Sequence, residues 1–190
     1  MHFVIGRALS AACFILAPAA ASAHVDVGHV DTVAAGVAHP LSGLDHLLAA
    51  FAVGLWATLV GYRRPLIWPA IFVLVMAAAT IAGAEGVRVP LIEPAIAGSV
   101  VALGLLIVFA VKAPLALGGV LIALFALVQG QAHGAEGGAA LPYLAGLMIA
   151  TAALHVAGVA AGRLALAERP LLARAAGAAI AAVGVFLMAA

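Results

Sequence analysis

Histidine and carboxylate side chains gather in two short stretches of this sequence. The first stretch contains His39, Asp45 and His46, and the second contains His133 and Glu136. Imidazole and carboxylate groups are frequent ligands of divalent transition metals. Both stretches adjoin long apolar segments, where an ionisable group costs from a few to ~10 kcal/mol and is therefore rare and usually functional. The two stretches predict a metal-binding site within the membrane, close to one surface.

The spacing of the first stretch limits how its histidines could hold an ion. On an unbroken helix His39 and His46 share one face but lie ~10 Å apart along the axis, too far apart to bind the same ion. Pro40 and Gly43 lie between them and allow an irregular turn that would shorten this separation. The two carboxylates are expected either as ligands or as acceptors that orient a ligand imidazole.

Four further polar residues are candidates for the same chemistry. Gln129 lies one helical turn before His133, and Glu93 begins another apolar segment. His24 would become the first residue after removal of a leader, where its amine and imidazole could capture a divalent ion; a merely polar leader fits the sequence equally well. His155 lies alone in an apolar segment, where a hydrogen bond between helices is the commoner role and a station on an ion path is the alternative.

The donor types indicate which ions are suitable. Imidazole and carboxylate without thiolate suit nickel, cobalt, zinc or manganese, and they argue against Cu(I) and similar soft ions. The only cysteine, Cys13, lies in the expected leader, so we expect no thiolate ligand in the mature chain. The ion is expected as a transported substrate, and no tightly bound cofactor is expected.

The elements that position these residues must be membrane helices. Of the 190 residues, 67% are hydrophobic and only 8% are charged, which a soluble domain of this size could not accommodate. Continuous apolarity favours helices over a barrel, and no basic patch suggests nucleic-acid binding. We expect an all-α, six-helix transmembrane bundle. Its spans are 41–60, 66–84, 92–111, 114–130, 142–161 and 171–189.

The first 23 residues resemble a cleavable signal peptide. Arg7 ends a short charged region, Ala8–Ala20 is apolar, and Ala21-Ser22-Ala23 has small residues where cleavage would occur. The alternative is a first transmembrane helix that stays attached. After cleavage, residues 24–190 would form one metal-permease domain, in which residues 24–38 are a polar lead into the first span.

Basic residues predict the orientation of the bundle in a bacterial inner membrane. If residue 24 is periplasmic, the loops after the first, third and fifth spans are cytoplasmic, and most Lys and Arg residues fall there, as the positive-inside rule requires. Both histidine stretches then reach the periplasmic face, so the first and fourth spans should touch at their outer ends. The cytoplasmic basic residues are Arg63, Arg64, Lys112, Arg163, Arg169 and Arg174, against Arg88 outside.

Two motifs resemble signatures of the HupE/UreJ family of hydrogenase and urease accessory proteins. One is His39-x5-Asp45-His46, followed by Val53-Gly54-Leu55-Trp56-Ala57; the other is Gln131-Ala132-His133-Gly134-x-Glu136-Gly137. The resemblance implies that the histidines and acids of both motifs act in nickel or cobalt transport, and that Glu93 matches a family acid. Members often carry histidine where this chain has Gln129, which weakens the case for nickel.

These observations together predict a permease rather than an enzyme. It would admit a divalent metal, nickel in the first place and cobalt in the second, from periplasm to cytoplasm. The resemblance implies that this ion serves hydrogenase or urease maturation, with a cytoplasmic metallochaperone as an expected partner beside the lipid bilayer. A phosphate-binding Gly-x-x-x-x-Gly-Lys motif is absent. Two alternatives stay open: an intramembrane zinc-dependent hydrolase, and an accessory protein that binds metal without transporting it.

Overall fold

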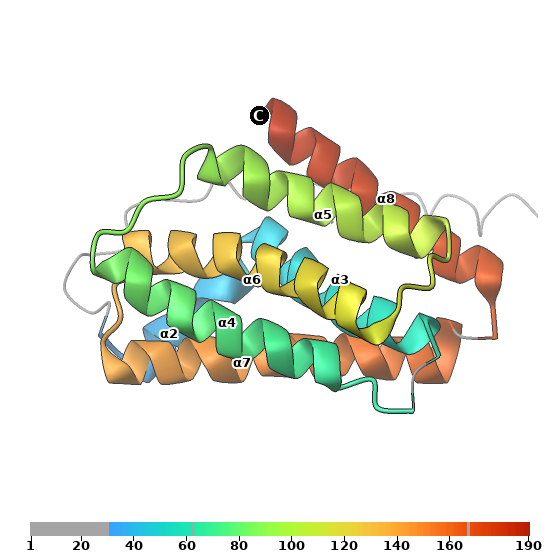
Figure 1. The fold of residues 1–190 in the computed structure, drawn as a ribbon, viewed down its shortest axis with the longest axis horizontal. Coiled ribbons are helices and arrows are strands. Elements are labelled where there is room, and N and C mark those ends of the chain that lie inside the picture. Colours follow the sequence, from blue (N-terminus) through green and yellow to red (C-terminus); the bar gives the residue numbers. More distant parts are fainter. Residues whose placement is uncertain (1–30, 62, 167) are drawn as a thin grey trace, which may run out of the picture.

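The computed structural model describes residues 31–61, 63–166 and 168–190, and these ranges are helical throughout apart from their connections (Figure 1). The expected leader at residues 1–23, its cleavage site and His24 lie outside the described residues. A short π-helix, Gly162–Leu166, follows the helix Leu141–Ala161. The α-helices are α2 (Val33–Ser42), α3 (Leu44–Leu59), α4 (Ile67–Ala84), α5 (Ile92–Val108), α6 (Leu115–Gly137), α7 (Leu141–Ala161) and α8 (Pro170–Ala189).

Four of these helices, α4, α6, α7 and α8, are long and apolar enough to cross a membrane. The pair α2 and α3 makes a fifth candidate if it is counted as one span broken by an 85° bend. The chain is therefore an integral membrane protein with four to five candidate spans, which confirms the all-helical expectation and meets the expected six spans in part. Helix α5 has 17 residues and is shorter than the segment 92–111, because the backbone turns at Ala110 with a φ of 50°.

The first span also begins earlier than expected. The sequence predicts a polar lead over residues 33–38, but α2 starts at Val33 because the Thr32 side chain accepts a hydrogen bond from the N–H of Ala35 at 3.1 Å. This contact satisfies one of the free N–H groups at the start of a helix. The apolar residues that follow can then continue as a helix and pack against α7.

The helices associate in three close pairs: α2–α3 with α7, α4 with α6, and α5 with α8 (Figure 1). Glycines let the backbones approach in each pair, as small residues do between membrane helices. A Cβ on Gly54 would meet the carbonyl of His155, and one on Gly158 would meet the carbonyl of Phe51. These glycines therefore serve packing between helices of this chain.

The directions of these pairs are defined by the same close approaches. Gly118 lies against Trp68 and Gly134 against Thr80, so α4 and α6 run in the same direction. Helices α2–α3 and α7 also run in one direction, because Gly36 lies against Tyr143 and Gly54 against His155. Helices α5 and α8 run in opposite directions. Each of these three relative directions is the one expected if successive helices cross the membrane in alternating directions.

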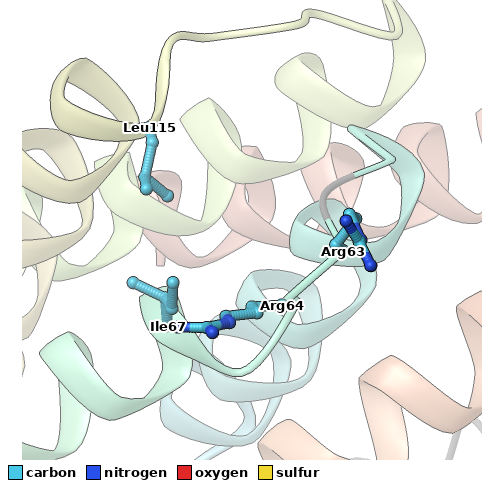
Figure 2. A pocket seen from close by; sticks show the side chains of 4 residues that line it. All are labelled: Arg63, Arg64, Ile67 and Leu115. Atoms are coloured by element: carbon cyan, nitrogen blue, oxygen red, sulfur yellow. The ribbon is translucent and has the colours of Figure 1, made fainter.

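Two tryptophans organise the end of the bundle at which α3 finishes and α4 begins. The rings of Trp56 and Trp68 stack with centroids 4.4 Å apart, and their indole N–H groups donate to the carbonyls of Val111 and Leu115, each at 3.0 Å. These bonds fix the connection between α5 and α6. Basic side chains gather at this same end, where a surface hollow is lined by Arg63, Arg64, Ile67 and Leu115 (Figure 2).

Candidate metal-binding site

The break between α2 and α3 brings the first two histidines together. Helix α2 ends at Ser42, and Gly43 has an extended backbone (φ −87°, ψ 112°) before α3 begins. Because of the 85° bend, the ring centroids of His39 and His46 lie 6.2 Å apart, compared with ~10 Å of axial separation on a straight helix. The Ser42 hydroxyl donates to the carbonyl of His39 at 2.8 Å and satisfies part of the free helix end. The irregular turn allowed by the sequence is confirmed.

Asp45 holds the ring of His46 in one orientation. Its Oδ1 accepts the backbone N–H of His46 at 2.8 Å and lies 2.7 Å from His46 Nδ1. A carboxylate acceptor at Nδ1 places the proton there and leaves Nε2 with its lone pair, the arrangement that commonly orients a metal-bound imidazole. His46 Nε2 is buried and has no hydrogen-bond partner among the described residues. Asp45 thus acts on His46 in this structure as an orienting acceptor.

Helix α6 contributes His133 to the same group. Its ring centroid lies 4.2 Å from that of His46 and 4.8 Å from that of His39, so the expected contact between the first and fourth spans is confirmed. The helix continues to Gly137, beyond the expected end at residue 130, and this extension carries His133 into the bundle. His133 is only 1% exposed, and its Nδ1 has no partner among the described residues.

Glu136 closes the group at its more exposed rim. Its Oε2 lies 3.3 Å from Nε2 of His39, and the two side chains are 53% and 27% exposed. His46 and His133 are more deeply buried than either. We call His39, Asp45, His46, His133 and Glu136 the outer cluster. Its exposure decreases from the Glu136–His39 pair towards the His46–His133 pair.

Sequence reasoning missed Tyr143, which borders the outer cluster. Its ring centroid lies 5.9 Å from that of His39, and the side chain is 1% exposed. The hydroxyl is buried without a hydrogen-bond partner among the described residues, and it lies against Gly137, where a Cβ would collide with it. An aromatic residue in the first turn of a membrane helix is common, so no signal in the sequence distinguished this tyrosine.

Among the described residues, the side chains of the other three candidates make no hydrogen bond, ion pair or ring contact with the outer cluster. The amide of Gln129 donates to the hydroxyl of Ser99 on α5 at 3.3 Å. Glu93 is exposed in the first turn of α5. His155 is buried deeper along α7, and its Nδ1 lies 2.6 Å from the carbonyl of Thr151 on the same helix. The sequence favours a hydrogen bond between two helices for such a histidine. In the part of the chain that the structure describes, the hydrogen bond of His155 instead lies within α7.

The outer cluster has suitable donors but not yet the geometry of a bound ion. In the part of the chain that the structure describes, no three His, Cys, Asp or Glu side chains are arranged so that they could hold a metal ion as they stand. Metal-bound imidazole nitrogens lie ~2.0–2.1 Å from an ion such as zinc, so the rings must turn around a common centre. The buried atoms without partners, His46 Nε2 and His133 Nδ1, are of the type that such an ion uses.

The fold and this cluster define a class: polytopic helical membrane proteins with ionisable side chains gathered inside the bundle. Comparison with known proteins then identifies the family. The family model described as HupE / UreJ protein matches residues 12–187. Protein HupE of Rhizobium leguminosarum bv. viciae is 42% identical over 179 residues, which cover 90% of this chain and 91% of that protein. The chain belongs to the HupE/UreJ family, which is associated with hydrogenase and urease accessory function. No solved structure matches it.

Proposed function

We propose that this protein is a permease, and not an enzyme, that carries a divalent transition metal from the periplasm to the cytoplasm. Nickel is the first candidate substrate and cobalt the second. The observation that carries the proposal is the meeting of His39, His46 and His133 with two carboxylates at one end of the bundle. Family membership supports it, because a relative named Protein HupE aligns along almost the whole chain.

The proposed orientation places the outer cluster at the periplasmic face. Arg63, Arg64 and Arg163 border a hollow at the other end of the bundle, which is the distribution that the positive-inside rule favours for the cytoplasmic side. We count α5 as a sixth span in this proposal, because it packs against α8 along its length and α8 is a candidate span itself. The periplasmic N-terminus and the cleaved leader belong to the same proposal.

Ion entry would follow the decrease in exposure within the outer cluster. Glu136 and His39 lie at the exposed rim and would attract the hydrated cation, and His46 and His133 would then replace some of its water. Neutral imidazoles suit a site that must also release its ion, because conduction needs binding that is neither too weak nor too strong. The membrane potential supplies about 2.3 kcal/mol per charge per 100 mV, and so about twice that for a dication.

The cellular role that we propose is supply of metal for maturation of a hydrogenase or a urease, with a cytoplasmic metallochaperone receiving the ion. This part rests on the family alone. It predicts that deletion of the gene lowers the activity of the metalloenzyme in cells grown with little metal, and that added nickel or cobalt restores this activity.

Transport is tested with the purified full chain in sealed liposomes that contain a metal-sensitive dye. With an inside-negative potential, we expect entry of nickel or cobalt, inhibited by an excess of the preferred ion and lost in His46→Ala. Zinc is added in competition to establish the preference. Metal binding without flux would instead indicate a non-transporting accessory protein. The absence of both binding and flux would reject the proposal altogether.

A further inference from the structure

His155 has an unusual environment in the middle of α7. The side chain is 1% exposed, and the edge of its ring faces Phe72 of α4 with centroids 4.9 Å apart. Its Nδ1 lies 2.6 Å from the carbonyl of Thr151, which has no proton to give, so Nδ1 must be the protonated donor. The other nitrogen, Nε2, then carries a lone pair. It is buried and has no hydrogen-bond partner among the described residues.

A purely structural role explains this arrangement poorly. The one hydrogen bond of His155 lies within α7, one turn back, so it joins no two helices of the described chain. A buried acceptor without a partner destabilises the folded chain, because it has lost its hydrogen bonds to water. Thr151, on the same face of α7, also has a buried hydroxyl with no partner among the described residues. Two buried atoms that could coordinate a metal ion, His155 Nε2 and the Thr151 hydroxyl oxygen, are thus left without hydrogen-bond partners on one face of α7.

The depth of His155 is defined by the packing of α3 against α7. A Cβ on Gly54 would meet the carbonyl of His155, so the two residues lie at the same level. Gly54 follows His46 on α3, and helical rise puts this level ~12 Å inward from the outer cluster. Gly162, near the end of the bundle where the arginines gather, lies ~10 Å beyond His155 by the same measure. His155 is therefore about midway between the outer cluster and the arginines.

We propose that His155 Nε2 coordinates the transported divalent ion as an inner station, with the Thr151 hydroxyl as a weaker second donor. The proposal rests on the permease function proposed above and extends it to this chain's own mid-membrane residues. A dication that leaves the outer cluster would otherwise cross apolar surroundings without a ligand, and an ionic charge there is costly. One imidazole and one hydroxyl bind weakly enough to let the ion leave again, which conduction through successive stations requires.

The test uses the full chain in sealed liposomes and three substitutions of the same residue. His155→Leu removes the donor, and we expect nickel flux to fall about tenfold or more, while binding of nickel to the detergent-purified protein at the outer cluster is kept. His155→Gln keeps a donor for the Thr151 carbonyl and should also lose flux. His155→Cys restores a metal ligand of softer type, so it should recover flux in part and shift the preference from nickel towards cadmium.

Thr80→Ala is the matched control, because it removes another buried polar side chain whose hydrogen bond lies within its own helix, and it should leave flux within about twofold. If His155 had only a structural role, all three substitutions would lower flux equally and none would change the ion preference. Flux of His155→Leu close to that of the wild type would also overturn the inner station, although the permease function would stand. Absence of flux in the wild type would overturn both proposals.

Discussion

Asp45 Oδ1 lies 2.7 Å from His46 Nδ1 and also accepts the backbone N–H of the same residue at 2.8 Å. These two contacts orient both the ring and the start of α3, and a carboxylate in the first turn of a helix is favoured by the helix dipole. The ring of His46 lies beside that of His133, with centroids 4.2 Å apart. The carboxylate thus determines which nitrogen of His46 is available to an ion.

Replacement of Asp45 should weaken metal binding without abolishing it. Loss of an orienting carboxylate typically lowers metal affinity 10–100-fold, so we expect about that decrease for Asp45→Asn, measured by competition with a chromophoric chelator. Asp31→Asn, which changes an exposed acid before α2, is the control and should bind as the wild type does. Complete loss of binding in Asp45→Asn, equal to the loss in His46→Ala, would mean that the carboxylate is itself a ligand.

A methyl group at Gly43 should disturb the outer cluster. Its Cβ would lie 2.9 Å from Asp45 Oδ1 and 3.1 Å from His46 Nδ1, so the hydrogen bond between these side chains must shift. We expect Gly43→Ala to lower metal affinity about tenfold, since it displaces the same orienting contact. In Gly98→Ala a Cβ meets nothing within 4 Å, and affinity should be unchanged. Equal affinities of the two variants would show that the bend tolerates a side chain and does not position the histidines.

The sequence predicted which parts of the chain meet, because span length and the distribution of Lys and Arg determine which helix ends share a membrane face. Pro40 and Gly43 allowed an irregular turn, but the sequence could not predict its 85° angle, because that angle depends on how α2 packs against α7. The sequence spacing also predicted that Gln129 and His133 lie on one face of the same helix. The Gln129 amide nevertheless reaches Ser99 on α5, since a long side chain can turn to a neighbouring helix. Tyr143 was missed for a similar reason: only the packed bundle brings it beside His39.

Close packing of α3 and α7 should be sensitive to one added methyl group. In Gly158→Ala the Cβ would meet the carbonyl of Phe51 and lie 2.9 Å from the N atom of Leu55, and backbone atoms cannot move away cheaply. We expect a loss of about 1–3 kcal/mol of stability, as for other overpacked sites, measured as a lower midpoint of thermal unfolding in detergent. Gly98→Ala is again the control. The packing described here would be contradicted if Gly158→Ala unfolded at the temperature of the wild type.

Single cysteines test the proposed orientation. In a Cys13→Ser background, Glu85→Cys and Lys112→Cys place thiols at exposed positions near opposite ends of the bundle. With the outer cluster periplasmic, a membrane-impermeant maleimide added to spheroplasts should label Glu85→Cys, whereas Lys112→Cys should react only after the membrane is opened. Labelling of the second variant in sealed spheroplasts, with the first protected, would invert the orientation and with it the direction of transport.

We expect imidazoles from α2, α3 and α6 to bind the ion together. X-ray absorption at the nickel edge of the loaded, purified protein measures this directly, because imidazole rings give a characteristic scattering pattern that water and carboxylate do not. We predict two or three imidazoles in a nitrogen- and oxygen-coordinated site without sulfur, and one imidazole fewer in His133→Ala. A spectrum with oxygen ligands alone, unchanged by His133→Ala, would contradict the account.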